Sequence, residues 1–388
     1  MRISIPYLLT VIVSVLLIII GHSIAAKGLL TFQDSSWEIV NARVQKIVER
    51  IEPGDRLDFI DDFDYFDDYD DLLSVMGVKI IFEARITNGV RRGEIVLAEQ
   101  SFSPLLQDRS KEVARGNSIS LINTDMGWFF NGYILINKLI VLGVIFTLCI
   151  LFFGGKKGFN TILSLGLTCA AVFAVFIPSI LTGKNIYLMA VLVCVYTTPM
   201  TLLLVIGFNQ KSLAAMIGCM SGIVVTGIIT LVMDKVLFLT GIVDEHSRYL
   251  ANLPLDVPIN LKAIVFAGII IGAMGAIMDV AMSISSSMWE IKEKAVKIDF
   301  NSLFRSGINI GRDILGSMAN TLVLAYIGTS LSIVLLLSIY SNSLYELLNR
   351  EMIVVEILQA LAGIFGILSA MPLTAFICAA FYLKKKSI

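Results

Sequence analysis

Acidic and hydroxyl side chains recur at helical spacing along one apolar run in the second half of the chain. Steps of three or four residues place side chains on one face of a helix, and here they select Gly272, Ala276, Asp279, Ser283, Ser287 and Glu290. If this run crosses a membrane, its glycines let another helix approach closely. Asp279 must then face that neighbour or water, because a charged group is costly in lipid. We therefore predict a polar site in which Asp279 carries a proton or a cation, lined also by Ser283, Ser286 and Ser287.

The next apolar run begins with a second polar face, made of Arg312, Asp313, Gly316, Ser317, Asn320 and Thr321. From the rise of an α-helix, Asp279 lies roughly 24 Å beyond Ala263, and Asn320 lies roughly 9 Å inside the cytoplasmic end of its own run. The two faces are therefore predicted to occupy similar depths near the cytoplasmic surface, where Asn320 coordinates or hydrogen-bonds a solute. The alternative is a helix–helix interface sealed by polar contacts, with Arg312 neutralising an acidic partner.

A proline interrupts another apolar run close to its middle, in the sequence Thr197-Thr198-Pro199. Proline removes one backbone hydrogen bond and clashes with the carbonyl group four residues earlier. Broken helices often border the binding sites of transporters. Thr198 and Pro199 are thus candidates for the same pathway, and the alternative is a kink without a function.

A cluster of aspartates in residues 55–71 is the only candidate for a metal site. Calcium and magnesium prefer several carboxylate oxygens, and the closest set is Asp61, Asp62, Asp64, Asp67 and Asp68. The spacing of an EF-hand is absent from this segment, so the alternative is a solvated acidic loop whose charges repel one another.

Other kinds of chemistry find no support in the sequence. It contains no H-E-x-x-H, no Walker A motif and no G-x-S-x-G, so we predict that the protein is not an enzyme and uses no cofactor. The five cysteines lie far apart in apolar runs, without a Cys-x-x-Cys pair. A net charge of −1 argues against a partner made of nucleic acid.

The composition indicates that these apolar runs cross a membrane. Hydrophobic residues make up 56% of the 388, charged residues make up 16%, and the mean hydropathy is +0.83. Soluble chains carry roughly 25% charged residues, and a membrane span requires about 20 apolar residues. Runs of this kind lie near residues 5–24, 134–153, 161–180, 186–206, 213–231, 263–279, 314–338 and 353–383.

Lysine and arginine collect on alternate loops between these runs, which by the positive-inside rule places those loops in the cytoplasm. The basic positions are Arg2, Lys156–Lys157, Lys211, the segment 292–312 and Lys384–Lys386. We therefore predict an all-α polytopic membrane bundle of about eight transmembrane helices, with both termini cytoplasmic. Residues 1–26 are predicted to be an uncleaved anchor helix, although Ser23-Ile24-Ala25 is similar to a signal-peptide cleavage site.

A small extracytoplasmic β domain is predicted for residues 27–132, between the first and second helices. Segments 37–44 and 78–86 partly alternate between apolar and polar residues, as half-buried strands do. Turn signals such as Asn88-Gly89 separate further short segments, so four or five strands in a compact barrel or sandwich are expected. Residues 133–388 are predicted to form a seven-helix membrane domain. The aromatic residues Trp128, Phe129, Phe130 and Tyr133 just before it are predicted to form a belt at the lipid headgroups.

Two long motifs resemble the YibE/YibF family of bacterial multi-span membrane proteins. The first runs from Gly275 to Ser287 and is followed by Glu290-Ile291, and the second runs from Gly311 to Gly328. The resemblance covers the chain from about Ile134 onward and is looser in the β domain. It implies a multi-pass protein of the bacterial cytoplasmic membrane with residues 27–132 outside. It also makes Asp279, Arg312 and Asn320 motif positions, but it implies no biochemical activity.

Two functions remain open from the sequence. The first is a secondary transporter or permease for an ion or small solute, with its polar site on the sixth and seventh helices. The second is a non-transporting scaffold or assembly protein whose outside domain binds a partner. The predicted partners are the lipid bilayer, an ion or small solute, and a second copy or another membrane protein.

Overall fold

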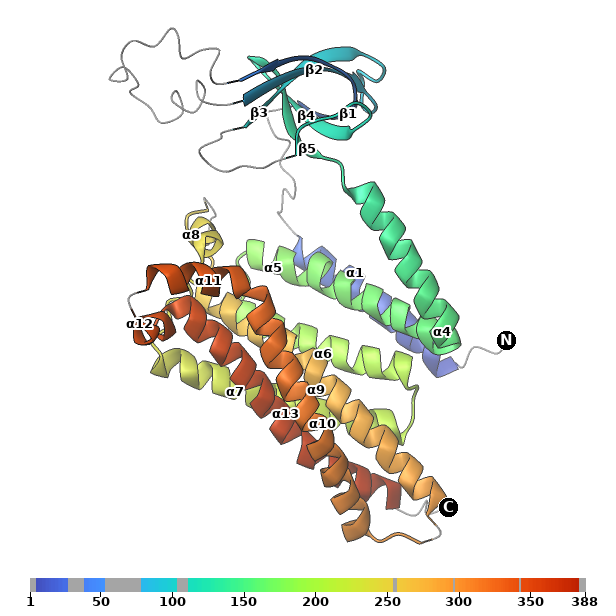
Figure 1. Cartoon of the computed structure of the whole chain (residues 1–388). Coiled ribbons are helices and arrows are strands. Elements are labelled where there is room, and N and C mark those ends of the chain that lie inside the picture. The colour runs from blue at the N-terminus through green and yellow to red at the C-terminus, as the bar shows by residue number, and fades with distance from the viewer. Residues whose placement is uncertain are drawn as a thin grey trace. The chain divides into compact units, whose positions relative to one another are not determined.

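The structure, a computed structural model, describes residues 5–26, 38–52, 78–102, 111–253, 257–295, 297–341 and 343–383. It divides into two compact units. One comprises Met1–Leu29 with Ile150–Ile388, and the other comprises Leu30–Cys149. The first unit is helical, and the second contains the β domain together with the beginning of the helix that follows it (Figure 1).

Five strands form the β domain and close into a barrel in the order β1-β2-β3-β5-β4 (Figure 1). Neighbouring strands are antiparallel except β3 and β5, which are parallel. Of the two alternatives predicted from the sequence, a barrel and a sandwich, the structure shows the barrel, and the prediction of four or five strands is confirmed. The strands are β1 (Glu38–Ile51), β2 (Val78–Ile86), β3 (Ile95–Phe102), β4 (Ser118–Thr124) and β5 (Gly127–Tyr133).

Alternation along the strands builds the core of this barrel. In β2, Ile80, Phe82, Ala84 and Ile86 point inward, and the residues between them are more exposed. Successive side chains of a strand point to opposite faces, so each strand contributes every second residue to the core. The other inward residues are Val40, Ala42, Val44, Val96, Ala98, Ile119 and Leu121.

The aromatic residues before the second predicted span belong to strand β5, and their level relative to the lipid headgroups stays a prediction. Trp128, Phe130 and Tyr133 pack against the barrel core, and the Phe130 and Tyr133 rings meet edge to face with their centroids 5.1 Å apart. Aromatic residues are common in strands as well as in membrane interfaces. The amino-acid composition of these residues does not distinguish a strand from a segment at a membrane interface. Their pairing with the neighbouring strands shows that they form a strand.

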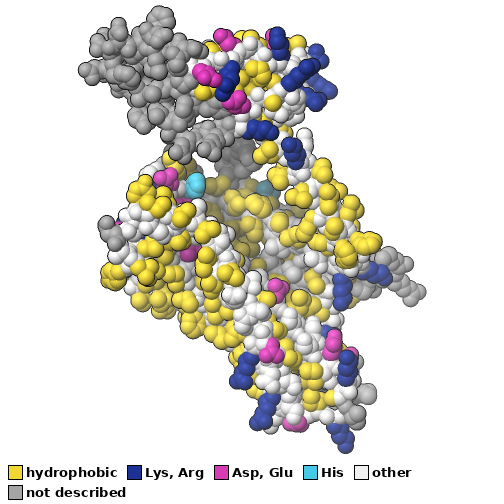
Figure 2. Space-filling view, viewed as in Figure 1, with side chains coloured by type: hydrophobic (Ala, Val, Ile, Leu, Met, Phe, Trp, Pro, Cys, Tyr) yellow, Lys and Arg dark blue, Asp and Glu magenta, His cyan; other side chains and the backbone are white. Residues whose placement is uncertain are grey.

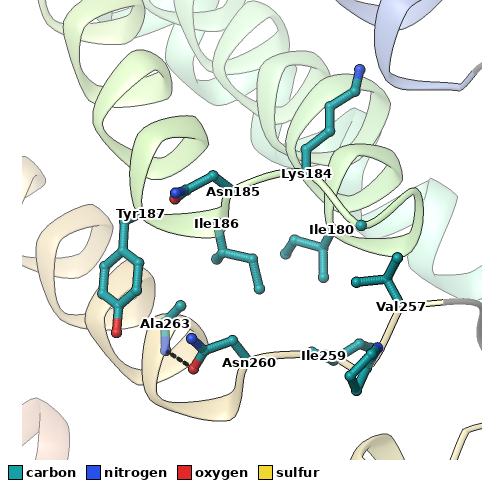
Figure 3. Close-up of a pocket in the computed structure, with 11 residues that line it drawn as sticks. Ile180, Lys184, Asn185, Ile186, Tyr187, Val257, Ile259, Asn260 and Ala263 are labelled. Carbon is teal, nitrogen blue, oxygen red and sulfur yellow. Dashed lines mark hydrogen bonds between the residues drawn. The ribbon is translucent and has the colours of Figure 1, made fainter.

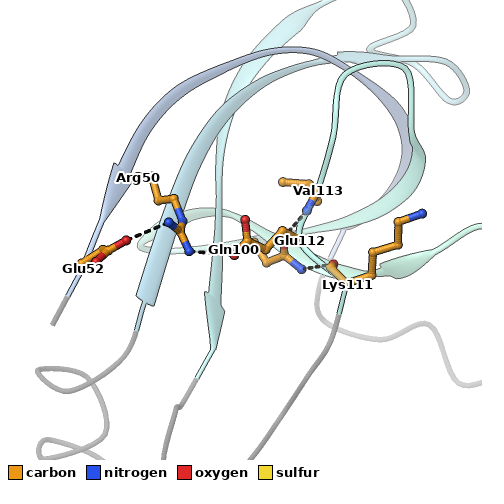
Figure 4. A network of polar contacts seen from close by, with 6 residues as sticks. All are labelled: Arg50, Glu52, Gln100, Lys111, Glu112 and Val113. Atoms are coloured by element: carbon orange, nitrogen blue, oxygen red, sulfur yellow. Dashed lines mark hydrogen bonds and ion pairs between the residues drawn. The ribbon is translucent and has the colours of Figure 1, made fainter.

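One buried amide fixes the chain that leads into β4. Gln100 is only 2% exposed; its Nε2 donates to the Lys111 carbonyl oxygen at 3.2 Å, and its Oε1 accepts from the Val113 amide at 2.8 Å. Nearby, Arg50 forms ion pairs with Glu52 and Glu112 (Figure 4). These ion pairs are exposed and contribute little, so the stability of this corner rests on Gln100.

Replacing Gln100 with leucine is expected to destabilise the barrel by about 1–3 kcal/mol, because the buried Val113 amide loses its acceptor. Hydrogen exchange of residues 111–124 in the full-length protein measures the effect. Arg50→Ala, which removes only exposed ion pairs, is the matched control and is expected to change the exchange rates little. Equal protection in the Gln100→Leu variant and in the wild type would contradict this assignment.

The other unit is built from helices, and six helical segments among the described residues are long and apolar enough to cross a membrane. A further pair of bent helices satisfies the same test only when taken together. The six segments are Pro6–Ala25 in α1 (Ile5–Ala25), Ile136–Leu181, Ile186–Val205 (α6), Gln210–Val236 (α7), Leu261–Lys294 (α9) and Glu351–Leu383 (α13).

The segment Ile136–Leu181 covers the second and third predicted runs and is broken between them. It contains α4 (Ile136–Ala170), a π-helical stretch (Ala171–Phe176) and α5 (Ile177–Leu181). Within α4, Gly155 has non-helical angles of φ 52° and ψ −126°. A Cβ placed on Gly158 would lie 2.2 Å from the Ile150 carbonyl oxygen. The chain therefore turns sharply back on itself, and glycine provides both the positive φ and the room.

The seventh predicted run is also divided. Helix α10 (Phe300–Thr329) ends at Ser330, and α11 (Leu331–Tyr340) continues at an angle of 63°. Short helices α8 (Glu245–Ala251) and α12 (Leu344–Leu348) lie in the connections. The apolar runs thus predicted where helices occur, but not the bend between α10 and α11.

Helix α9 lies at the centre of the helical unit, where it packs against α6, α7, α10 and α13. Small residues permit the close contacts. A Cβ on Gly222 of α7 would lie 2.7 Å from the Gly366 carbonyl oxygen of α13, and a Cβ on Gly307 of α10 would lie 2.5 Å from Met288 Sδ of α9. Close backbone approach through glycine is typical of helix packing in membranes.

Candidate functional site

One face of α9 carries a stripe of small and acidic residues that other helices leave exposed. Five positions on it are exposed, namely Gly268, Gly272, Gly275, Asp279 and Glu290, and Ser283 and Ser286 on the same face are partly exposed. They follow one another at intervals of three or four residues, so they form one stripe along the helix. Most residues of the polar face predicted from the sequence therefore lie on the side of α9 that no other helix of the unit covers.

The exposed side chains of this stripe differ from those of helices that present an aliphatic surface to lipid. Helix α1 exposes leucine, isoleucine and valine along its length, as does the first part of α4. By contrast, between Leu261 and Val323 no described large hydrophobic side chain is exposed. Figure 2 shows hydrophobic side chains over much of the helical unit, and charged side chains gathered where α9 ends and α10 begins. The exposed face of α9 and of the first two-thirds of α10 is therefore not built to contact lipid tails.

Helix α10 separates an apolar from a polar face. Gly307 and Gly311 are buried against α9 and α13, whereas the opposite side exposes a row of polar or small residues. This row comprises Arg305, Asn309, Arg312, Asp313, Gly316, Ser317 and Asn320. The polar face predicted for residues 312–321 is thus largely exposed on the folded unit.

The contacts between α9 and α10 set the relative level of the two polar faces. Gly311 approaches Ile284 and Gly307 approaches Met288, so the helices run antiparallel. In this register Asp279 lies level with Gly316, and Arg312 lies about one turn, roughly 5 Å, closer to the α9–α10 connection. Asn320 lies level with Gly275.

Asp279 has no polar partner within the described chain. No hydrogen bond or ion pair of Asp279, Arg312, Asp313 or Asn320 occurs among the residues that the structure describes. The polar faces share a depth range but do not bind each other through these side chains. Their functional groups are therefore free to meet water, a solute or another protein.

A further polar group lies beside the glycine end of the stripe. Tyr326 Oη of α10 and Gln359 Nε2 of α13 both lie 3.4 Å from a Cβ position built on Gly272. Tyr326 is missing from the site residues predicted by sequence reasoning, because a single tyrosine in the middle of the apolar run 314–338 gives no periodic signal. Its place in the site follows only from the way α10 crosses α9.

One serine of the 283–287 run is structural, and it is one that the predicted site omits. Ser285 is fully buried; its Oγ donates to the Lys211 carbonyl oxygen at 2.8 Å and lies 2.6 Å from Tyr382 Oη. The Trp289 and Tyr382 rings pack edge to face beside it. This cluster joins α7, α9 and α13, whereas Ser283, Ser286 and Ser287 remain partly exposed.

Thr198 and Pro199 lie away from this stripe, in α6. Thr198 is fully buried, with its Oγ1 3.9 Å from Cys219 Sγ of α7, and the neighbouring Thr197 Oγ1 lies 2.9 Å from Met274 Sδ of α9. The helix continues through Pro199. In the structure these hydroxyl groups connect α6 to its neighbours.

A cavity of about 210 Å³ lies where α6 and α9 begin (Figure 3). Two of its polar side chains cap helices: Asn185 accepts from the Leu188 amide, and Asn260 accepts from the Ala263 amide. Lys184 donates to the Ile24 carbonyl oxygen and extends away from the cavity. The lining that remains is mostly aliphatic, so this cavity is a weaker candidate than the α9–α10 face.

No group of three or more metal-ligating side chains is present in the described part of the chain. The predicted metal residues Asp61, Asp62, Asp64, Asp67 and Asp68 lie outside the described residues. The acidic segment therefore remains a sequence-based prediction.

The model of the YibE/F-like protein family matches residues 142–384 of the chain. This is more than half of the sequence. The chain belongs to the YibE/F-like family. The match includes both polar faces and all of α6, α7, α9 and α10, and it confirms the resemblance inferred from the two motifs. The barrel of this YibE/F-like protein lies before the matched residues. No curated protein and no solved structure matches the chain.

Proposed function

We propose that this YibE/F-like protein is a secondary transporter or permease that moves an ion or a small solute along the polar face of α9 and α10. One observation carries the proposal: no described large hydrophobic side chain is exposed in residues 263–279 and 314–323, which belong to the sixth and seventh predicted spans. A lipid-facing surface would present aliphatic side chains there, whereas a hydrated pathway requires small and polar ones.

Asp279 is the group proposed to carry the charge. An aspartate costs about 2.5–3.5 kcal/mol at the centre of a membrane helix, and less at the depth of Asp279 near the cytoplasmic surface. Its carboxylate has no partner in the described chain that would offset this cost. Arg312, Asp313, Asn320, Ser283, Ser286 and Ser287 line the same face and provide further polar contacts for a hydrated solute.

The proposal includes the membrane arrangement inferred from the sequence. Eight spans place both termini in the cytoplasm and the barrel outside a bacterial cytoplasmic membrane, by the distribution of lysine and arginine. The break at Gly155 separates the second predicted span from the third, and the bent pair α10–α11 together makes up the seventh, so both are compatible with this count. The protein is proposed to catalyse no reaction.

Transport by the purified full-length protein in sealed vesicles tests this function. Vesicles that hold a pH-sensitive dye are exposed to panels of monovalent cations, divalent cations and small organic ions. We expect flux above that of empty vesicles for at least one panel. The scaffold function is favoured over transport if two results are obtained together. The folded protein supports no flux with any panel, and a variant without residues 27–132 fails to restore the phenotype of cells that lack the protein.

A further inference from the structure

Helical glycines in this protein fall into two groups. Gly218 and Gly222 of α7, and Gly307 and Gly311 of α10, are four residues apart and pack tightly against neighbouring helices. Gly268 and Gly272 of α9 have the same spacing. No atom lies within 4 Å of a Cβ built on Gly268, Gly275 or Gly316, and a Cβ on Gly272 would meet only the ends of the Tyr326 and Gln359 side chains, at 3.4 Å. The spacing that holds helices together inside the chain therefore recurs on its outer face without a helix to fill it.

The same face carries one charge of each sign without a partner. Asp279 and Arg312 are both exposed, and neither has an ion pair in the described chain. The helix register places them about one turn apart in depth, which is within the reach of an arginine side chain. Asp279 lies at the end of the sixth predicted span, where an unpaired charge facing lipid is costly, and Arg312 lies at the cytoplasmic edge of the same face.

We infer that two copies of this chain pack together through the α9–α10 face, defined as the exposed residues Gly268, Gly272, Gly275, Asp279, Arg312 and Gly316. Copies inserted in the same direction are related by a two-fold axis along the membrane normal. Such an interface is self-complementary: Asp279 of each copy pairs with Arg312 of the other, and the glycines allow the two α9 helices to approach closely.

The charges favour a second copy over lipid or an unrelated helix, because the face carries both halves of its own ion pair. The inference goes beyond the proposed transport function. If both hold, the pathway is enclosed between the two copies, and each contributes one polar wall. Asp279 of each copy then faces both the pathway and Arg312 of the partner copy.

Cysteine cross-linking in native membranes tests the interface. In a full-length protein whose five native cysteines are replaced, Gly275→Cys is expected to form disulfide-linked dimers about tenfold more than Gly143→Cys. Gly143 is the matched control, because it is also a helical glycine with no atom within 4 Å of its Cβ position, but it lies among exposed leucines and isoleucines of α4. Ser283→Cys provides a second position on the face if Gly275→Cys does not fold.

Charge reversal tests the ion pair. Asp279→Arg and Arg312→Asp are each expected to raise the dimer dissociation constant about tenfold or more, and the double variant is expected to restore dimerisation. Asp313→Arg is the control for reversal at an adjacent exposed position.

The inference is overturned if Gly275→Cys dimerises no more than Gly143→Cys, if it cross-links only to another protein, or if the double reversal gives no recovery. If the protein transports as a monomer, the dimer interface is contradicted but the transport function is not. If it forms the dimer but supports no flux, the transport function is contradicted but the interface is not.

Discussion

Asp279→Asn is expected to lower flux by about tenfold or more, a loss of at least about 1.4 kcal/mol of transition-state stabilisation. The amide has nearly the same shape as the carboxylate but carries no charge and does not bind a proton in the physiological range. Since Asp279 makes no hydrogen bond or ion pair within the described chain, its loss removes no contact that holds the protomer together. Flux in reconstituted vesicles is measured together with the yield of folded protein, which separates a loss of transport from a loss of folding.

Two further variants make this prediction specific. Asp279→Glu keeps the charge one methylene farther from the backbone and is expected to retain part of the flux. Asp313→Asn, which neutralises a neighbouring exposed carboxylate of α10, is expected to reduce flux less than Asp279→Asn. Equal flux in Asp279→Asn and the wild type would remove Asp279 from the mechanism while leaving the fold unaffected.

Gly218→Leu is expected to have the largest effect on stability, at about 3 kcal/mol or more, because it overpacks the contact between α7 and α13. A Cβ on Gly218 would lie 1.8 Å from Thr374 Oγ1 and 2.9 Å from Thr374 Cβ. Thr374 is fully buried, so its short side chain has no free space to enter. Thermal unfolding in detergent, followed by loss of the monodisperse protein, measures the effect.

The matched control for this prediction is Gly166→Leu in α4. Gly166 is exposed and no atom lies within 4 Å of its Cβ position, so leucine there is expected to be neutral or mildly stabilising. The smaller change Gly218→Ala is expected to be partly rescued by Thr374→Ala, which removes the closest atom. Similar thermal stability of Gly218→Leu and Gly166→Leu would show that α7 and α13 do not pack as described.

The two polar faces show how far the sequence predicts the site. Period-three-to-four spacing assigned Asp279, Ser283 and Glu290 to one helix face, and this face is uncovered in the folded unit. The same spacing carried no information about Ser285, whose hydrogen bonds reach Lys211 and Tyr382. Those partners are 74 and 97 residues away in the chain, and local periodicity does not report contacts at such separations.

The sequence by itself determined the apolar helices, the alternating strands and the family, because local hydrophobic periodicity and long motifs are properties of neighbouring residues. Only the tertiary structure decided that the aromatic residues at 128–133 close a barrel, that Gly155 breaks a helix, and that Thr198 faces Cys219. It also decided which side of the α9–α10 pair is left without aliphatic cover. These outcomes depend on which distant segments pack together, and burial is assigned only when all of the helices are in place.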